Sequence, residues 1–191
     1  MRPAARLRRA YFECRYGQLH VHQAIPPGGG FDEAVPLVCV PGAQGTGRFF
    51  RTLLGPLGAD RSVYAPDLPG CGESDSAGVD AGSEQYALAL ADLLDSLRQR
   101  QVDVLAHAEG VDTAIALERL RPRSLARRMV FTAAPPRSLE IARNLKIVLR
   151  ELPQTSVAGD VLTLWSGGVQ LDELIEFLGS GSHAAERSSQ F

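Results

Sequence analysis

The fold is decided by the segment Val102-Asp103-Val104-Leu105-Ala106-His107-Ala108-Glu109-Gly110. The aliphatic run that opens this segment is typical of a strand buried on both faces of a sheet. Residues 107–110 then predict a sharp turn, after which a helix runs to about Arg121. We therefore expect a tight strand-to-helix corner with Ala108 at its tip and with small residues, Ala106 and Gly110, on either side.

Two more strands followed by distinctive turns are predicted upstream of this corner. The first strand, at residues 35–40, leads into a glycine-rich turn at residues 41–47. The second strand, at residues 62–65, leads into a turn at residues 66–74 that is rich in glycine and proline. Together with the corner they give three strand-and-turn units in a row.

The rest of the chain alternates short apolar runs with helical stretches, without a repeat or a long linker. The remaining predicted elements are a hairpin of residues 11–15 and 18–24 joined at Gly17, helices at residues 48–57, 83–97 (capped by Ser83) and 139–151, strands at residues 129–133 and 160–165, and a last strand or helix at residues 173–177. This alternation indicates an α/β fold, with a parallel sheet covered by helices on both faces.

The three turns resemble motifs of the α/β-hydrolase family, in the same order, and the resemblance spans residues 11–191. Residues 38–43 resemble the family's oxyanion strand, residues 65–74 its D-x-x-G-x-G-x-S turn, and residues 106–110 its nucleophile elbow, G-x-S-x-G. The resemblance implies a mostly parallel sheet in a single domain over residues 1–191, without a cap domain. Residues 1–9 and 180–191 are expected to be disordered.

The resemblance also implies that the corner provides backbone hydrogen-bond donors. The N–H of the residue after the tip, Glu109, lies at the start of a helix in such an elbow, and the N–H of Ala43 is the second donor. Two fixed donors that face developing negative charge contribute several kcal/mol of transition-state stabilisation. We therefore expect an oxyanion hole formed by Ala43 and Glu109.

Ala108 occupies the nucleophile position, and alanine has no atom that can attack a carbonyl group. Loss of a triad nucleophile lowers kcat by about 10⁶, so hydrolysis through an acyl-enzyme is expected to be absent or very slow. Three explanations remain open at this point: an introduced serine-to-alanine substitution, a natural loss of the serine, and a purely structural turn.

The C-terminal residues resemble the family's histidine loop. In that comparison His183 is the catalytic base, although residues 180–191 are also small and polar enough to be an unstructured tail. The acid position after the strand at residues 160–165 holds no carboxylate, and Asp172 is the nearest candidate. Asp172 has the alternative role of an ordinary carboxylate at a helix start.

The chain is short for this family. About two dozen residues separate position 136 from position 160, which is too few for the usual helical lid, and the closing helix after the histidine loop is missing. A sheet of this kind exposes apolar surface beside its last strands. Three outcomes are open for this surface: a second copy of the chain covers it in a homo-oligomer, another partner covers it, or nothing does in a degraded fold.

Other candidate sites carry weaker signals. His20 and His22 share one face of a predicted strand, but no third metal ligand is evident, and a solvated strand edge is the expected role. Asp67 is expected to stabilise its turn and not to act as a catalyst. The turn at residues 42–47 has the spacing G-x-x-G-x-G and lacks the G-x-G-x-x-G of dinucleotide-binding folds. We predict no metal ion and no cofactor.

Charge and composition exclude several other classes of protein. A net charge of −2 gives no general attraction to nucleic acid or to anionic membranes. No apolar run predicts a membrane span or a signal peptide. The three cysteines are too scattered for a disulfide framework or a zinc site, which favours a reducing, cytoplasmic location.

Two function hypotheses follow. In the first, the chain is a relative of ester and thioester hydrolases that takes a small acyl compound, either as an inactive variant or through non-nucleophilic chemistry such as proton abstraction with His183. In the second, it is a pseudoenzyme that binds a small acyl ligand or a protein partner. Ester turnover by an Ala108→Ser variant would separate the two hypotheses.

Overall fold

The computed structural model describes residues 4–28, 34–42, 45–78, 80–121, 126–133, 136–143, 148–152, 174–176 and 178. Its strands form one sheet in the order β1-β2-β4-β3-β5-β6-β7. The strands are β1 (Arg6–Cys14), β2 (Gly17–Ile25), β3 (Leu37–Val40), β4 (Val63–Pro66), β5 (Val102–His107), β6 (Ala126–Thr132) and β7 (Val148–Leu152). Strands β3 to β7 run parallel, while β2 pairs antiparallel with both β1 and β4. The predicted mostly parallel α/β sheet is confirmed.

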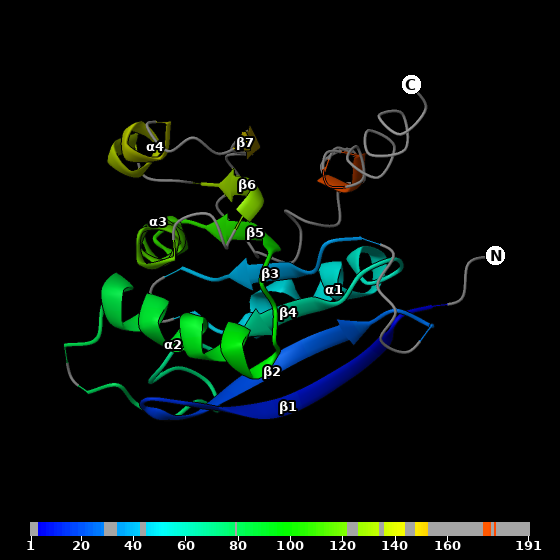
Figure 1. Cartoon of the computed structure of the whole chain (residues 1–191), viewed down its shortest axis with the longest axis horizontal. Helices are drawn as coiled ribbons and strands as arrows, with labels where there is room; N and C mark the ends of the chain where they lie inside the picture. Colours follow the sequence, from blue (N-terminus) through cyan, green and yellow to red (C-terminus); the bar gives the residue numbers. More distant parts are fainter. Residues whose placement is uncertain are drawn as a thin grey trace.

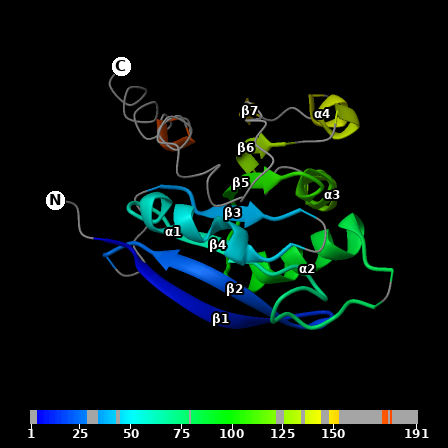
Figure 2. The ribbon, with the colours of Figure 1, turned by 180° about the vertical axis from the view of Figure 1, so that it is seen from behind.

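Helices lie on both faces of the sheet, as Figures 1 and 2 show. They are η1 (Gly47–Phe50), α1 (Arg51–Leu57), α2 (Ser83–Ser96), α3 (Gly110–Leu120) and α4 (Pro136–Arg143). Helices α2, α3 and α4 lie on one face, and α1 lies on the other (Figure 1). The part of the chain described here contains no cap domain over the sheet, and no helix in it is both long enough and apolar enough to cross a membrane.

Each face of the sheet has its own hydrophobic core. On one face, α2 and α3 bury leucines such as Leu90 and Leu117 against β2, β3, β5 and β6. On the other face, Phe50 and Leu53 of η1 and α1 pack with Leu174, from the short helical stretch at residues 174–176. A fully buried side chain of this size contributes about 1.5–3 kcal/mol. Burial on both faces explains why the central strands read as continuous apolar runs.

A buried ion pair holds the late helical stretch in place. Nη1 of Arg61 lies 3.3 Å from Oδ2 of Asp103, and both side chains are almost fully buried. Nη2 of Arg61 donates a hydrogen bond of 3.1 Å to the carbonyl oxygen of Leu178. Residues 173–177 were predicted as strand or helix, and the helical alternative is the one observed for residues 174–176.

The prediction of a helix over residues 139–151 is wrong. The helix α4 covers only Pro136–Arg143, and Val148–Leu152 forms strand β7 beside β6. Proline is well suited to the first turn of a helix, which accounts for the earlier start. The parallel pairing with β6 outweighs the local helical pattern at residues 148–151. The strand predicted at residues 160–165 lies outside the described residues.

Two further predictions, one for the N-terminal residues and one for the cap of α2, also need correction. Residues 6–9 were expected to be disordered, but they extend β1 because each pairs with a residue of β2. Residues 180–191 lie outside the described part. Ser83 does not cap α2: the N-cap is Gly82, whose N–H donates a hydrogen bond of 3.1 Å to Oε1 of Gln85.

Candidate functional site

The carboxyl ends of the parallel strands bring the three predicted turns to one edge of the sheet. Strand β3 ends before Gly42, β4 before Asp67, and β5 before Ala108. Ligand sites of open α/β sheets form at this edge. We call the turn around Ala108, together with Gly42 and Glu109, the Ala108 corner.

The backbone at the Ala108 corner has the strained geometry of a sharp strand-to-helix turn. Ala108 lies between β5 and α3 with a φ of +48°, in the left-handed region. This conformation costs a residue with a Cβ about 1–2 kcal/mol. The N–H of Ala108 donates a hydrogen bond of 2.9 Å to the carbonyl oxygen of Thr132, which ties the corner to β6.

Two glycines let the corner pack directly against the turn after β3. A Cβ on Gly110 would lie 2.3 Å from the carbonyl oxygen of Pro41 and 2.6 Å from that of Val40, so the position requires glycine. A Cβ on Gly42 would lie 3.4 Å from the Cβ of Ala108 and 3.0 Å from Oε2 of Glu109. The close contact between the backbone of Gly110 and the end of β3 therefore explains why the elbow pattern requires glycine at this position.

The Ala108 corner opens into a hollow of about 450 Å³. Its lining residues are Pro41, Gly42, Gly45, Thr46, Arg48, Phe49, His107, Ala108 and Glu109. The His107 ring stacks on Phe49 with centroids 4.4 Å apart, and its Nδ1 shares a hydrogen bond of 2.9 Å with Oγ1 of Thr132. Burial lowers the pKa of His107, so the imidazole is neutral at pH 7.

The predicted site residues are only partly brought together in the described structure. Ala108 and Glu109 form the tip of the corner, and Glu109 is the N-cap residue of α3, at the helix start where backbone donors lack helical partners. Ala43, Asp172 and His183 lie outside the described residues, so their roles remain predictions. Sequence reasoning missed His107 as a lining residue, although its position beside the elbow tip is a usable signal.

The turn after β4 is held by Asp67, as predicted. Its buried carboxylate accepts hydrogen bonds from the backbone N–H groups of Gly47 at 2.7 Å and Glu73 at 3.1 Å, and it shares a hydrogen bond of 2.9 Å with Nδ1 of His20. A Cβ on Gly72 would lie 2.1 Å from Oδ2 of Asp67, so glycine is required there too. The aspartate and glycine of the motif therefore have a structural role.

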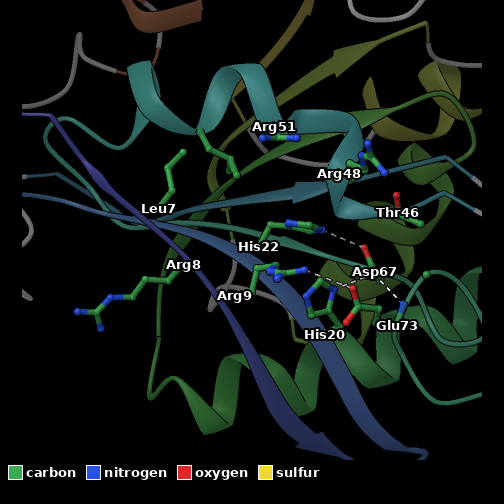
Figure 3. Close-up of a pocket in the computed structure, with 12 residues that line it drawn as sticks. Leu7, Arg8, Arg9, His20, His22, Thr46, Arg48, Arg51, Asp67 and Glu73 are labelled. Atoms are coloured by element: carbon green, nitrogen blue, oxygen red, sulfur yellow. Dashed lines mark hydrogen bonds and ion pairs between the residues drawn. The ribbon is translucent and has the colours of Figure 1, made fainter.

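A second cavity lies next to Asp67 and has a volume of about 710 Å³. It is lined by residues that include His20, His22 and Asp67, which Figure 3 shows facing one another. We call these three residues the His20 cluster. His20 and Asp67 are 1% and 2% exposed, and His22 is half-buried. Thr46 and Arg48 line both cavities.

The prediction for the two histidines is wrong on two counts. They do not form a solvated edge, and a third potential ligand is present in Asp67. The reason is the antiparallel register: β2 runs against β4, so His20 lies where β4 ends, and the N–H of Asp67 donates to the carbonyl oxygen of His20 at 2.9 Å. The sequence did contain signals for this cluster: two histidines that are two residues apart, and an aspartate that directly follows a strand.

The chain matches known proteins at the level of fold and family. An epoxide hydrolase, CorEH, aligns with a TM-score of 0.59 at 22% identity, over 69% of this chain and 44% of that protein. The N-acyl homoserine lactonase AidH aligns with a TM-score of 0.58 at 26% identity, over 68% of this chain and 46% of the lactonase. The haloalkane dehalogenase DbeA from Bradyrhizobium elkani aligns with a TM-score of 0.58 at 22% identity, over 68% of this chain and 42% of the dehalogenase.

The chain therefore spans less than half the length of these solved structures. No curated protein sequence matches it. The model of the alpha/beta hydrolase family matches residues 37–186, which is most of the chain and includes all three turns. Sheet order, the corner and this match agree, and the chain belongs to the alpha/beta hydrolase family.

Proposed function

We propose that this protein binds a small acyl compound, such as an ester, thioester or lactone, at the Ala108 corner without forming an acyl-enzyme there. The observation that carries the proposal is the Ala108 methyl group itself. It stands at the left-handed tip of the elbow, against Gly42, where the chemistry of the family requires a nucleophilic side chain.

The lining of the hollow suits a ligand with a carbonyl group and a short apolar part. The N-terminus of α3 offers the N–H of its N-cap residue, Glu109, and the positive end of a helix dipole to the carbonyl oxygen. Phe49 and Pro41 provide apolar surface. The lactonase AidH, whose fold this chain shares, has been solved in complex with N-butanoyl homoserine, and this supports an acyl compound as the ligand class.

Binding and turnover should be measured together on the natural chain. We expect N-hexanoyl homoserine lactone or an alkyl butyrate to give a saturable isotherm by calorimetry, while chromatography detects no product above the buffer control. Glu109→Trp should weaken binding by at least about tenfold, because the new side chain fills the exposed mouth of the hollow. Arg98→Trp is the matched control, since it lies outside both cavities.

Two results would contradict this proposal. One is the absence of binding by every acyl compound tested. The other is turnover by the natural chain at a rate similar to that of an Ala108→Ser variant. The Ala108→Ser variant is expected to gain hydrolysis if the predicted base, His183, reaches the corner.

Proton transfer by His107 is a second candidate function. His107 lines the same hollow, is neutral at pH 7 because burial lowers its pKa, and lies close to the carboxylate of Glu109. A neutral imidazole of this kind can abstract a proton from a bound acyl compound. The test is hydrogen isotope exchange at the carbon next to the carbonyl group of the acyl compound. Exchange that is lost in His107→Gln and retained in Ala108→Gly would favour this function over simple binding.

A further inference from the structure

We propose that the His20 cluster binds a divalent transition-metal ion of the zinc type, with His20, His22 and Asp67 as its protein ligands. One ligand atom from each residue lies within 4.8 Å of the other two. Figure 3 shows the three side chains converging from β2 and from the end of β4. This site is separate from the Ala108 corner and goes beyond the proposed function.

The distances in the cluster are close to those that a metal ion requires. Nδ1 of His20 lies 2.9 Å from Oδ2 of Asp67, and Nε2 of His22 lies 3.7 Å from Oδ1. Zinc bonds of about 2.0–2.1 Å in a tetrahedron place neighbouring ligand atoms about 3.3 Å apart. Each histidine nitrogen therefore lies within a few tenths of an ångström of that spacing from one oxygen of Asp67, and side-chain rotation has to close the remaining separations, which are at most 4.8 Å.

The surrounding structure orients the carboxylate and one imidazole before any metal binds. The backbone N–H groups of Gly47 and Glu73 each donate to a different oxygen of Asp67, which leaves lone pairs on both oxygens. Such supporting hydrogen bonds are typical of metal ligands. Nδ1, which lies 2.9 Å from Oδ2 of Asp67, is the nitrogen of the buried His20 ring that would bind the metal.

The charges around the cluster are compatible with a cation. The carboxylate of Asp67 and the imidazoles of His20 and His22 form a typical zinc donor set. The nearby Arg9 lies 3.5 Å from the carboxylate of Glu73, so its charge is compensated. Arg48 and Arg51, on the opposite wall of the cavity, are exposed to solvent, which screens their charge.

The cluster leaves one side of the metal position open. His22 lines the cavity of about 710 Å³, so a fourth ligand would be water or a bound molecule. Structural zinc sites have four protein ligands, whereas catalytic and binding sites have three and keep one position open.

The test is metal titration of the chelator-treated, dialysed full chain. We expect Co²⁺ to give visible d–d absorption bands with one equivalent bound, and Zn²⁺ to displace it. His22→Gln should weaken Zn²⁺ binding by at least about 100-fold, because it removes a direct ligand. His107→Gln, the same substitution at a histidine outside the cluster, should leave the affinity unchanged.

The proposal is overturned if the natural chain binds Co²⁺ no more tightly than His22→Gln, or if binding depends on His107 or His183 instead. Circular dichroism checks that each variant is folded. If His22→Gln does not fold, X-ray absorption of the zinc-loaded natural chain decides: imidazole and oxygen ligands support the site, and sulfur ligands from a cysteine contradict it. The result does not depend on whether the Ala108 corner binds an acyl compound.

Discussion

The Ala108 corner and the His20 cluster lie at the same edge of the sheet and are built in opposite ways. The corner is a backbone structure: a left-handed residue, a glycine in contact with carbonyl oxygens, and a side chain without reactive atoms. The cluster is a side-chain structure, in which buried titratable groups meet through the register of β2 and β4. Backbone geometry set by packing can persist without a reactive group, and reactive groups can meet where no known motif predicts them.

The largest effect is expected from removing the carboxylate at the centre of the cluster. Asp67→Ala leaves the N–H groups of Gly47 and Glu73 without their acceptor and the buried His20 ring without its hydrogen-bond partner. We expect a loss of about 3–5 kcal/mol in the free energy of unfolding, measured by urea denaturation. Glu73→Gln, at an exposed side chain, is the control and should change stability far less. Equal losses in both variants would show that the cluster is not held by Asp67.

The corner should be most sensitive to a change in its glycine. Gly110→Ala places a methyl group 2.3 Å from the carbonyl oxygen of Pro41, and relief requires β3 and α3 to separate. We expect a loss of about 1–3 kcal/mol in thermal or urea unfolding. Gly55→Ala is the matched control: its Cβ meets nothing within 4 Å, and the helix should gain about 0.5–1 kcal/mol. If Gly110→Ala leaves the free energy of unfolding unchanged, the elbow and the turn after β3 are not in contact.

A smaller effect, of opposite sign, is expected at the tip. Ala108→Gly removes the Cβ from a residue with a φ of +48° and should stabilise the fold by up to about 1 kcal/mol. Ala114→Gly, inside α3, should destabilise it by about 1 kcal/mol or more, because that alanine is helical and buried. If both glycines destabilise the protein to the same degree, Ala108 is not in the strained conformation.

The smallest expected effect is a dependence of stability on pH that arises from His107, beside the Ala108 corner. Burial lowers the pKa of His107 below 6.5, although Glu109 opposes the shift. As the pH falls below about 6.5, His107 takes up a proton in the unfolded chain before it does so in the folded chain. Because the unfolded state then binds more protons, the free energy of unfolding falls. The loss continues until the pH passes the pKa of the folded state. His107→Gln should flatten the stability curve between pH 5 and 7, and an unchanged slope would contradict the assignment.

Much of the fold could be predicted from the sequence because local patterns and packing agree there. The strand, tip and helix around Ala108 follow from an aliphatic run, small residues and a glycine, and the structure supplies the contact that Gly110 serves. The prediction failed at residues 148–151, where pairing with β6 outweighs a helical pattern. The His20 cluster was missed because it depends on register between β2 and β4, which periodicity in a single chain segment does not contain.

The most direct test of the account is acylation of an Ala108→Cys variant by p-nitrophenyl butyrate, followed by intact-protein and peptide mass spectrometry. The natural chain is the control, because burial raises the pKa of each of its own thiols, Cys14, Cys39 and Cys71, and keeps them poorly reactive. We predict one butyryl group on residue 108 of the variant and none on the natural chain. A folded variant that is acylated no faster than the natural chain would contradict the claim that the corner still presents its tip to an acyl compound.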